Sequence, residues 1–304
     1  MWIGTFADGV LKYDGSNFTN YTTKNSALSN DSISCLYIDA EDDVYIGTQQ
    51  GLNVFSSNKI TCPAEINKAI GKGIVNSVCV DRNDCLWLGV IDRKQVGSGI
   101  YVFHNDTIEF YNDQNSALPN NLINTIVCGK DGKVWIGTNQ IGGKGGLVSI
   151  QNNQWQVYTK NNSALPYNCV EKIVPMADSS IITASRMLFY DDATKMHGYV
   201  YQLENLDHWT DLSPGNSNPV VSNRITSIAV SSEGILVAAT SLDAHIPDDR
   251  YDLSVYRYKQ WITFDALGYP IENFIPDMAF DAAGNLWVLI PDNREMLKIS
   301  NFLD

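Results

Sequence analysis

Apolar and polar positions follow one another along this chain in short blocks, and the same order of blocks recurs from one end to the other. A short apolar run ends in Asp or a small residue, as in Val75–Asp81 and Ile275–Asp281. A polar turn follows, and then a second apolar run. Asp, Asn and Gly in these turns are typical of tight β-hairpins. The pattern predicts antiparallel strand pairs, and only Ala64–Ile70 shows a helical pattern, of about one or two turns.

The second apolar run is the clearest repeat, with the form Trp-Ile-Gly-Thr. Seven copies recur at intervals of roughly 40 to 55 residues. The copies begin at Trp2, Tyr45, Trp87, Trp135, Ile182, Val237 and Trp287. The fifth and sixth copies have lost the Trp and the Gly, and they rest on spacing and pattern only. This interval is typical of β-propeller blades and not of helical solenoids.

Each repeat contains two further strand-like segments, so it holds four strands that we call a, b, c and d. Segment c is apolar, as in Gly51–Phe55, and segment d is more polar and aromatic, as in Gln154–Thr159. Runs a and b are almost continuously apolar, as expected where neighbouring blades cover both faces of an inner strand. The sequence therefore predicts an all-β, seven-bladed β-propeller of four-stranded antiparallel blades, forming one domain over residues 1–304.

The first and last blades are incomplete in this prediction. No segment precedes the b strand that begins at Trp2, and only residues 301–304 follow the last c strand. The first blade thus lacks its inner strand, and the last blade lacks its outer strand. We expect either a ring that closes with two three-stranded blades or completion by residues beyond this chain.

Charge and composition narrow the expected partners. The formal net charge is −13 at pH 7 and no cluster of Lys and Arg occurs, which argues against nucleic acid and against an anionic membrane surface. No apolar run is long enough to span a bilayer, so no membrane insertion by this chain is expected.

The six cysteines form neither a CxxC pair nor a zinc-binding spacing, so we expect no metal and no cofactor. Most of them lie inside strand-like runs, where a free thiol behaves as a small apolar side chain. Cys79 and Cys85 flank a short turn and are the pair considered for a disulfide, with free thiols favoured.

A second motif, Asn-Ser-Ala-Leu, precedes strand a at Asn25–Asn30, Asn115–Asn120 and Asn162–Tyr167. Together with the run Leu118–Leu147, which contains Trp-Ile-Gly-Thr and Gly-Gly-Leu, it resembles the two-component regulator propeller repeat. That repeat builds the periplasmic sensor regions of hybrid two-component systems in polysaccharide-degrading gut bacteria. The resemblance implies a sensor propeller of the periplasm or the bacterial cell surface that recognises glycan breakdown products. Signal output would lie outside these residues.

The sequence contains none of the common catalytic motifs, so the longest loops are the expected binding site. In a propeller the b–c and d–a connections emerge on one face, and most long connections of this chain belong to that face. Their Arg, Asp and Gln side chains suit sugar hydroxyls or carboxylates, and their tyrosines offer flat surfaces for stacking. The predicted ligand-binding residues are Asp92, Arg93, Gln140, Tyr167, Arg186, Asp243, His245, Arg250, Tyr251, Asp292 and Arg294.

Three functions follow from these observations. The favoured one is a non-catalytic sensor module that binds an oligosaccharide or a partner protein, and homodimerisation is left open. The first alternative is an interaction scaffold without a small ligand. The second is a metal-dependent lyase or hydrolase, because Asp281–Trp287 resembles the repeats of streptogramin lyases, which use a histidine and a metal at one end of the channel. Only His245 lies in a loop that reaches such a position, so the enzyme is less favoured.

Overall fold

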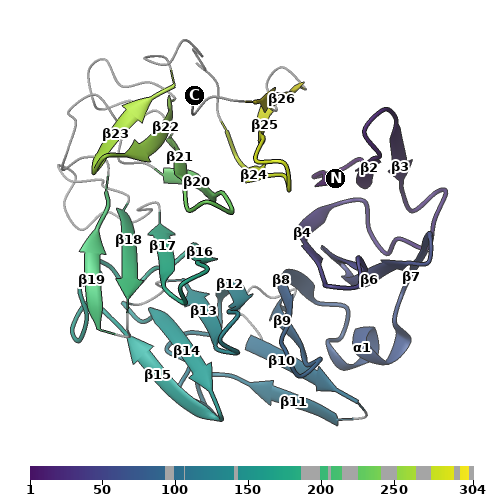
Figure 1. Ribbon diagram of the computed structural model, residues 1–304. Coiled ribbons are helices and arrows are strands. Elements are labelled where there is room, and N and C mark those ends of the chain that lie inside the picture. The colour runs from purple at the N-terminus through teal and green to yellow at the C-terminus, as the bar shows by residue number, and fades with distance from the viewer. Residues whose placement is uncertain are drawn as a thin grey trace. The chain divides into compact units, whose positions relative to one another are not determined.

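The apolar runs and polar turns of the sequence form seven antiparallel sheets, which are the blades of an all-β propeller (Figure 1). The computed structural model describes residues 1–92, 99–105, 107–139, 143–185, 199–204, 207–213, 225–240, 252–264, 275–290 and 295–300. The first and last blades have three strands and the other five have four. The predicted fold class, including its two incomplete blades, is confirmed.

The first compact unit, residues 1–163 with 167–170, contains blades 1 to 4. The strands of blades 1 and 2 are β1 (Trp2–Gly4), β2 (Val10–Tyr13) and β3 (Phe18–Tyr21), then β4 (Ile33–Ile38), β5 (Val44–Thr48), β6 (Gly51–Ser56) and β7 (Lys59–Thr61). The strands of blades 3 and 4 are β8 (Ile74–Val80), β9 (Leu86–Ile91), β10 (Gly99–His104) and β11 (Thr107–Tyr111), then β12 (Ile123–Cys128), β13 (Val134–Thr138), β14 (Leu147–Gln151) and β15 (Gln154–Tyr158). The expected helical turns form α1 (Ala64–Ala69).

The second unit, residues 164–166 with 171–304, contains blades 5 to 7. The strands of blades 5 and 6 are β16 (Lys172–Pro175), β17 (Ile181–Ser185), β18 (Tyr199–Glu204) and β19 (His208–Asp211), then β20 (Ile225–Val230), β21 (Leu236–Thr240), β22 (Asp252–Arg257) and β23 (Gln260–Thr263). The strands of blade 7 are β24 (Met278–Phe280), β25 (Leu286–Ile290) and β26 (Glu295–Ile299). The prediction of one domain over the whole chain stays a prediction.

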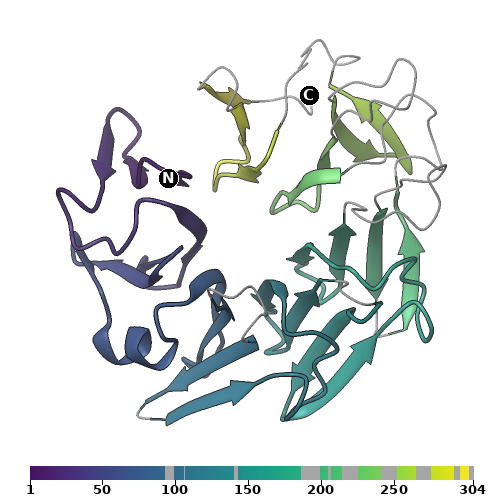
Figure 2. The ribbon, with the colours of Figure 1, turned by 180° about the vertical axis from the view of Figure 1, so that it is seen from behind.

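Inner strands of successive blades pack against one another within each unit. In the first unit β4 lies beside β8 and β8 lies beside β12, which both ribbon views show (Figures 1 and 2). Glycine in the repeated phrase permits this approach: a Cβ atom on Gly47 would lie 2.4 Å from the carbonyl oxygen of Val75, and one on Gly137 would lie 2.6 Å from that of Val170. The phrase therefore carries glycine where one blade touches the backbone of the next.

A bulge in strand a adds a side-chain link between blades. The register shifts between Ile33 and Cys35 in β4, and the extra residue Ser34 donates a hydrogen bond from Oγ to the carbonyl oxygen of Val75, at 2.5 Å. Equivalent bulge residues donate to the next blade at Asn76, Asn124 and Thr226. The repeat thus encodes contacts between blades as well as the strands within them.

The Asp-rich turns between strands a and b are held by their own side chains. Asp81 Oδ1 accepts hydrogen bonds from the backbone N–H groups of Asn83 and Cys85, at 2.8 and 3.1 Å. Its other oxygen, Oδ2, accepts one from Nε1 of Trp87, at 3.0 Å. Asp281 makes the same set of bonds, including one from Trp287 at 2.8 Å. The spacing between Asp and Trp in the repeat therefore allows the Asp side chain to stabilise the hairpin by hydrogen bonds.

The Asn-Ser-Ala-Leu motif also has a structural role. Asn25 Oδ1 accepts a hydrogen bond from the backbone N–H of Thr22 at 2.7 Å, and its Nδ2 donates to the carbonyl oxygen of Asn20 at 2.9 Å. The same bonds recur at Asn115 and Asn162. The leucines of the three copies, Leu28, Leu118 and Leu165, are buried. These connections are shaped by their own residues, so their length alone does not indicate a ligand site.

A disulfide joins Cys79 on β8 to Cys128 on β12, with the two Cα atoms 6.1 Å apart. The sequence favoured free thiols, which is wrong for Cys79 and Cys128, and the one pair that it considered, Cys79 with Cys85, is not the pair that forms. Cys79 lies opposite Trp87 in the β8–β9 ladder, and it packs in the cluster that blade 3 shares with blade 4, where Cys128 also lies. Cys85 is a free, half-buried thiol.

Within the described part of the chain, no helix is long and apolar enough to cross a membrane. Those residues also contain no cluster of His, Cys, Asp or Glu that is arranged to hold a metal ion.

Candidate functional site

The structure describes two of the predicted ligand-binding residues. Asp92 follows β9 directly, and Tyr167 lies in the connection that precedes β16; both are half-buried. The others, Arg93, Gln140, Arg186, Asp243, His245, Arg250, Tyr251, Asp292 and Arg294, lie outside the described residues. Binding on the b–c and d–a face therefore stays a prediction.

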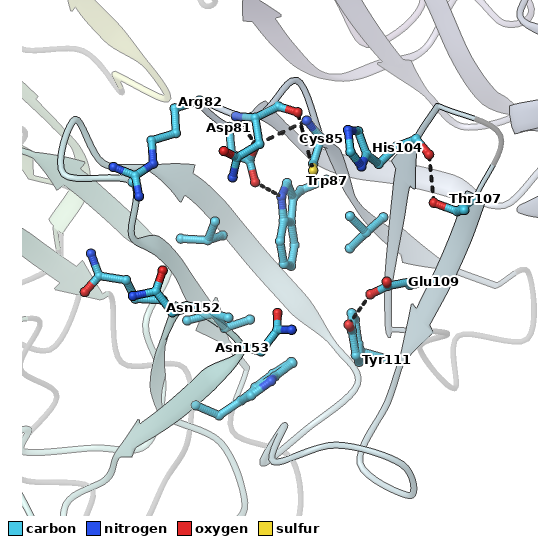
Figure 3. A pocket seen from close by; sticks show the side chains of 17 residues that line it. Asp81, Arg82, Cys85, Trp87, His104, Thr107, Glu109, Tyr111, Asn152 and Asn153 are labelled. Atoms are coloured by element: carbon cyan, nitrogen blue, oxygen red, sulfur yellow. Dashed lines mark hydrogen bonds between the residues drawn. The ribbon is translucent and has the colours of Figure 1, made fainter.

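A cavity of about 240 Å³ lies between blades 3 and 4 of the first unit (Figure 3). Its lining comes from the β8–β9 turn, the β10–β11 hairpin, the β12–β13 turn with the start of β13, and the β14–β15 hairpin. These are a–b and c–d connections, which emerge on the propeller face opposite to the one that the sequence indicated. We call this cavity the 3/4 groove.

The base of the 3/4 groove is apolar and is set by strand register. On blade 3, Val102 pairs with Trp87 on one side and with Glu109 on the other. On blade 4, Ile150 lies between Val134 and Trp155 in the same way. Because side chains on one face of a sheet lie in such cross-strand rows, the two rows face each other across the groove. The four innermost residues are buried: Trp87, Val102, Val134 and Ile150.

Polar and aromatic groups form the walls. On blade 3, Glu109 accepts a hydrogen bond from the hydroxyl of Tyr111, and the ring of Tyr111 lies edge-on to that of Trp155 on blade 4, with centroids 5.2 Å apart. His104 and Thr107 continue the blade 3 wall. Figure 3 shows Trp87 in the centre of the groove, with Glu109 and Tyr111 to one side of it and Asn152 to the other.

The hairpin of blade 4 supplies two adjacent amides to the rim. Asn152 and Asn153 both have left-handed backbones, with φ values of 51° and 61°, as a tight two-residue hairpin requires. Asparagine tolerates this conformation better than most residues, and here both side chains are exposed beside the cavity. The turn chemistry therefore also provides hydrogen-bond donors and acceptors at the site.

The titratable groups of the groove are arranged for binding more than for catalysis. Burial, the Asp81 carboxylate and the Glu109 carboxylate raise the pKa of the Cys85 thiol to about 11. Burial and the hydrogen bond to Glu109 raise the pKa of Tyr111 to about 12. At neutral pH both groups keep their protons, so neither is an activated nucleophile.

Sequence reasoning missed this site because it compared loop lengths and not strand positions. Register alignment puts Ile150 of β14 at the position of Phe55 in β6 and Phe103 in β10. It also puts Glu109 of β11 at the position of Thr61 in β7 and Thr19 in β3. Among the described strands, the carboxylate of Glu109 is the distinctive signal, since the other strand d residues at this position are Thr, Gln or Ile. Ile150 differs from the phenylalanines of blades 2 and 3, although blade 7 has an isoleucine there as well.

Comparison with known proteins supports both the repeat and the fold. The family model of the two-component regulator propeller matches residues 117–140. A protein named histidine kinase P4 from Formosa agariphila is 27% identical over 163 residues, which are 50% of this chain and 11% of that protein. The matched segment therefore corresponds to a small part of that relative's length.

Two solved structures illustrate the likeness in fold. A virginiamycin B lyase from Staphylococcus aureus is 14% identical with a TM-score of 0.67, over 98% of this chain and 89% of that chain. A GH74 xyloglucanase from Xanthomonas campestris is 13% identical with a TM-score of 0.68, over 97% of this chain and 49% of that chain. At such identity the likeness shows the fold alone. The resemblance that the sequence indicates is confirmed: the chain is a seven-bladed propeller that carries the two-component regulator propeller repeat.

Proposed function

We propose that this propeller is the ligand-binding input module of a bacterial two-component regulator, that it works in the periplasm or at the cell surface, and that it binds a carbohydrate in the 3/4 groove. The observation that carries the proposal is the composition of that groove, which combines an apolar base, aromatic walls and a polar rim. The propeller that contains the groove carries the two-component regulator propeller repeat.

The sensor part of the proposal is supported by two matches of different kinds. The matched repeat belongs to a two-component regulator family, and the curated relative is named as a histidine kinase. The matched half of this chain corresponds to 11% of that relative's length, which is compatible with an input module within a longer protein.

The disulfide supports an oxidising compartment. Disulfides persist in the periplasm and outside the cell and are rare in the bacterial cytosol. Cys79 and Cys128 are well placed for one, since they lie on adjacent inner strands of neighbouring blades. Thiol labelling of the protein isolated from its own cells would report this directly, because both cysteines would be protected until a reductant is added.

The carbohydrate part is supported by the chemistry of the walls. Glu109, Asn152 and Asn153 carry the carboxylate and amide groups that hydrogen-bond sugar hydroxyls. Tyr111 and Trp155 are half-buried, so each presents part of a ring to the cavity against which the C–H face of a sugar packs.

A thermal-shift and calorimetry screen of the intact chain with neutral oligosaccharides and with divalent metals tests the proposal. A ligand present at about 100 times its Kd stabilises the fold by roughly 2.7 kcal/mol, which a melting curve detects. We expect saccharide stabilisation in the wild type and its loss in Trp155→Ala. The matched control, Phe18→Ala, removes an exposed ring from strand d of blade 1 and should keep the response.

The other outcomes separate the alternatives. Stabilisation by a metal and not by saccharides would favour the lyase or hydrolase. The absence of a shift with either would contradict the proposal and favour a scaffold for protein partners.

A further inference from the structure

The charge of the 3/4 groove restricts the ligands that it accepts. Its lining contains two carboxylates, Asp81 and Glu109, and one guanidinium, Arg82. Arg82 is exposed, and it donates a hydrogen bond from Nη1 to the carbonyl oxygen of Asp131 at 3.4 Å. Asp84 lies in the same turn and adds a third carboxylate close by. The groove therefore has a net negative charge.

A thiol inside the groove reports the same electrostatic potential. Besides burial, the carboxylates of Asp81, Glu109 and Asp84 all raise the pKa of Cys85. Each of them disfavours a negative charge at that position, because like charges repel across a partly buried site. A negatively charged ligand group in the groove would meet the same repulsion.

Glu109 is the carboxylate best placed to contact a ligand. The Asp81 oxygens are occupied by the backbone of its own turn and by the indole of Trp87. Glu109 receives one hydrogen bond, from Tyr111 to Oε2, and Oε1 has no partner among the residues that the structure describes. A carboxylate oxygen of this kind accepts hydrogen bonds from hydroxyl groups and repels another carboxylate.

The size of the groove limits the length of the ligand. Its volume of about 240 Å³ lies below the range of roughly 300–1,000 Å³ that is usual for drug-sized ligands. Trp87 closes the base, and the hairpins of blades 3 and 4 bound the sides. A space of this size holds about one sugar ring and is too small for a longer segment of an oligosaccharide chain.

From charge and size together, and on the premise of the proposed function above, we propose that the 3/4 groove binds the terminal ring of a neutral saccharide and disfavours uronates and sulfated sugars, with Glu109 as the specificity-determining residue.

The test compares matched ligands on the intact chain. Methyl glycosides of glucose, galactose and mannose are titrated beside the corresponding uronates by calorimetry or saturation-transfer NMR. We expect each uronate to bind about tenfold more weakly than its neutral partner, as one partly solvated charge predicts. Glu109→Gln keeps an acceptor oxygen for Tyr111 and removes the charge, so the ratio should fall below about threefold. Glu41→Gln, which changes an exposed carboxylate in the β4–β5 turn, should leave the ratio unchanged.

The unfavourable outcomes are distinct. If neutral glycosides and uronates bind equally well, or if Glu109→Gln leaves their ratio unchanged, the specificity is wrong while the proposed function stands. If affinity rises steadily from one sugar to four, the single-ring site is wrong. If the protein binds none of the glycosides, the proposed function is wrong, and the proposed specificity is wrong with it.

Discussion

The groove between blades 1 and 2 and the groove between blades 3 and 4 share one strand register, yet the first is filled and the second is hollow. In the first, the ring of Phe55 on β6 lies 4.6 Å from that of Trp2 and 5.6 Å from that of Tyr21, measured between centroids. The ammonium group of Lys12 lies 4.7 Å from the centroid of the Phe55 ring. Three rings and a long cationic side chain thus occupy this groove.

In the 3/4 groove the same two positions carry Ile150 in place of Phe55 and Val102 in place of Lys12. Both side chains are shorter, and the polar groups of the hairpins surround the space that remains. The groove between blades 2 and 3 again has a phenylalanine, Phe103, whose ring centroid lies 6.4 Å from that of Tyr101. Blade 7 also carries an isoleucine at this strand c position, Ile299, and there it is buried in the core. The cavity between blades 3 and 4 therefore goes with the combination of Ile150 and Val102, and not with the strand c position of one blade alone.

The largest expected effect concerns the covalent link behind the 3/4 groove. Replacing both Cys79 and Cys128 by Ser should lower the free energy of unfolding by roughly 4 kcal/mol, because the disulfide closes a long loop in the unfolded chain. The corresponding link one blade earlier is a hydrogen bond from Tyr37 to the carbonyl oxygen of Val80. Tyr37→Phe should cost about 1 kcal/mol. Urea denaturation without reductant measures both, and equal losses would contradict this ranking.

The next effect concerns the strand c position at which the two grooves differ, Phe55 in the first and Ile150 in the second. Phe55→Ile should cost about 2 kcal/mol, since it removes a ring that is 5% exposed and surrounded by aromatic contacts. Ile150→Val, at the matching position in the 3/4 groove, should cost about 1 kcal/mol or less, because a cavity already borders that side chain. Denaturation midpoints compare the two variants. A larger loss for Ile150→Val would show that the 3/4 groove is packed as tightly as the other.

The smallest effect is electrostatic and uses Cys85 as a reporter. Alkylation of Cys85 should be slow at pH 8 and rise as the pH approaches about 11, because the reactive thiolate forms only near its raised pKa. Glu109→Gln removes one of the carboxylates that raise this pKa, so the rate at a fixed pH should increase by about two- to threefold. Peptide mass spectrometry follows Cys85, with the exposed Cys62 as the internal control. An unchanged alkylation rate at Cys85 would show that the Glu109 carboxylate does not affect the pKa of this thiol.

The fold could be predicted from the sequence because its signals are local and repeated. The spacing of Trp87, Trp135 and Trp287 together with Asp-rich turns defines the hairpins, and the structure shows these Asp side chains holding the turns and indoles. The two incomplete blades followed from counting strands. The partner of Cys79 was missed because Cys128 lies in the next blade. The spacing of residues within a single repeat does not indicate which side chains meet between two blades.

The site was harder to predict because its signal is a difference between repeats. Long d–a connections looked like binding loops, yet Asn25 and its counterparts show that these connections fold on themselves. The 3/4 groove depends on Ile150 and Glu109, which are ordinary strand residues until they are aligned by register with Phe55 and Thr61. Comparing the strands position by position would have found them.

The most direct measurement of the central claim fills the 3/4 groove with phenylalanine, the side chain that blades 2 and 3 carry at the same strand position. Ile150→Phe is titrated by calorimetry with the saccharide that stabilises the wild type best, beside Ile108→Phe. Ile108 is exposed on β11 and faces away from the 3/4 groove, so this control adds the same ring elsewhere. We predict that Ile150→Phe folds with an unchanged circular dichroism spectrum and binds at least about a hundredfold more weakly, because the ring occupies the ligand's space. Undiminished binding by a folded Ile150→Phe variant would contradict the assignment of this groove as the site.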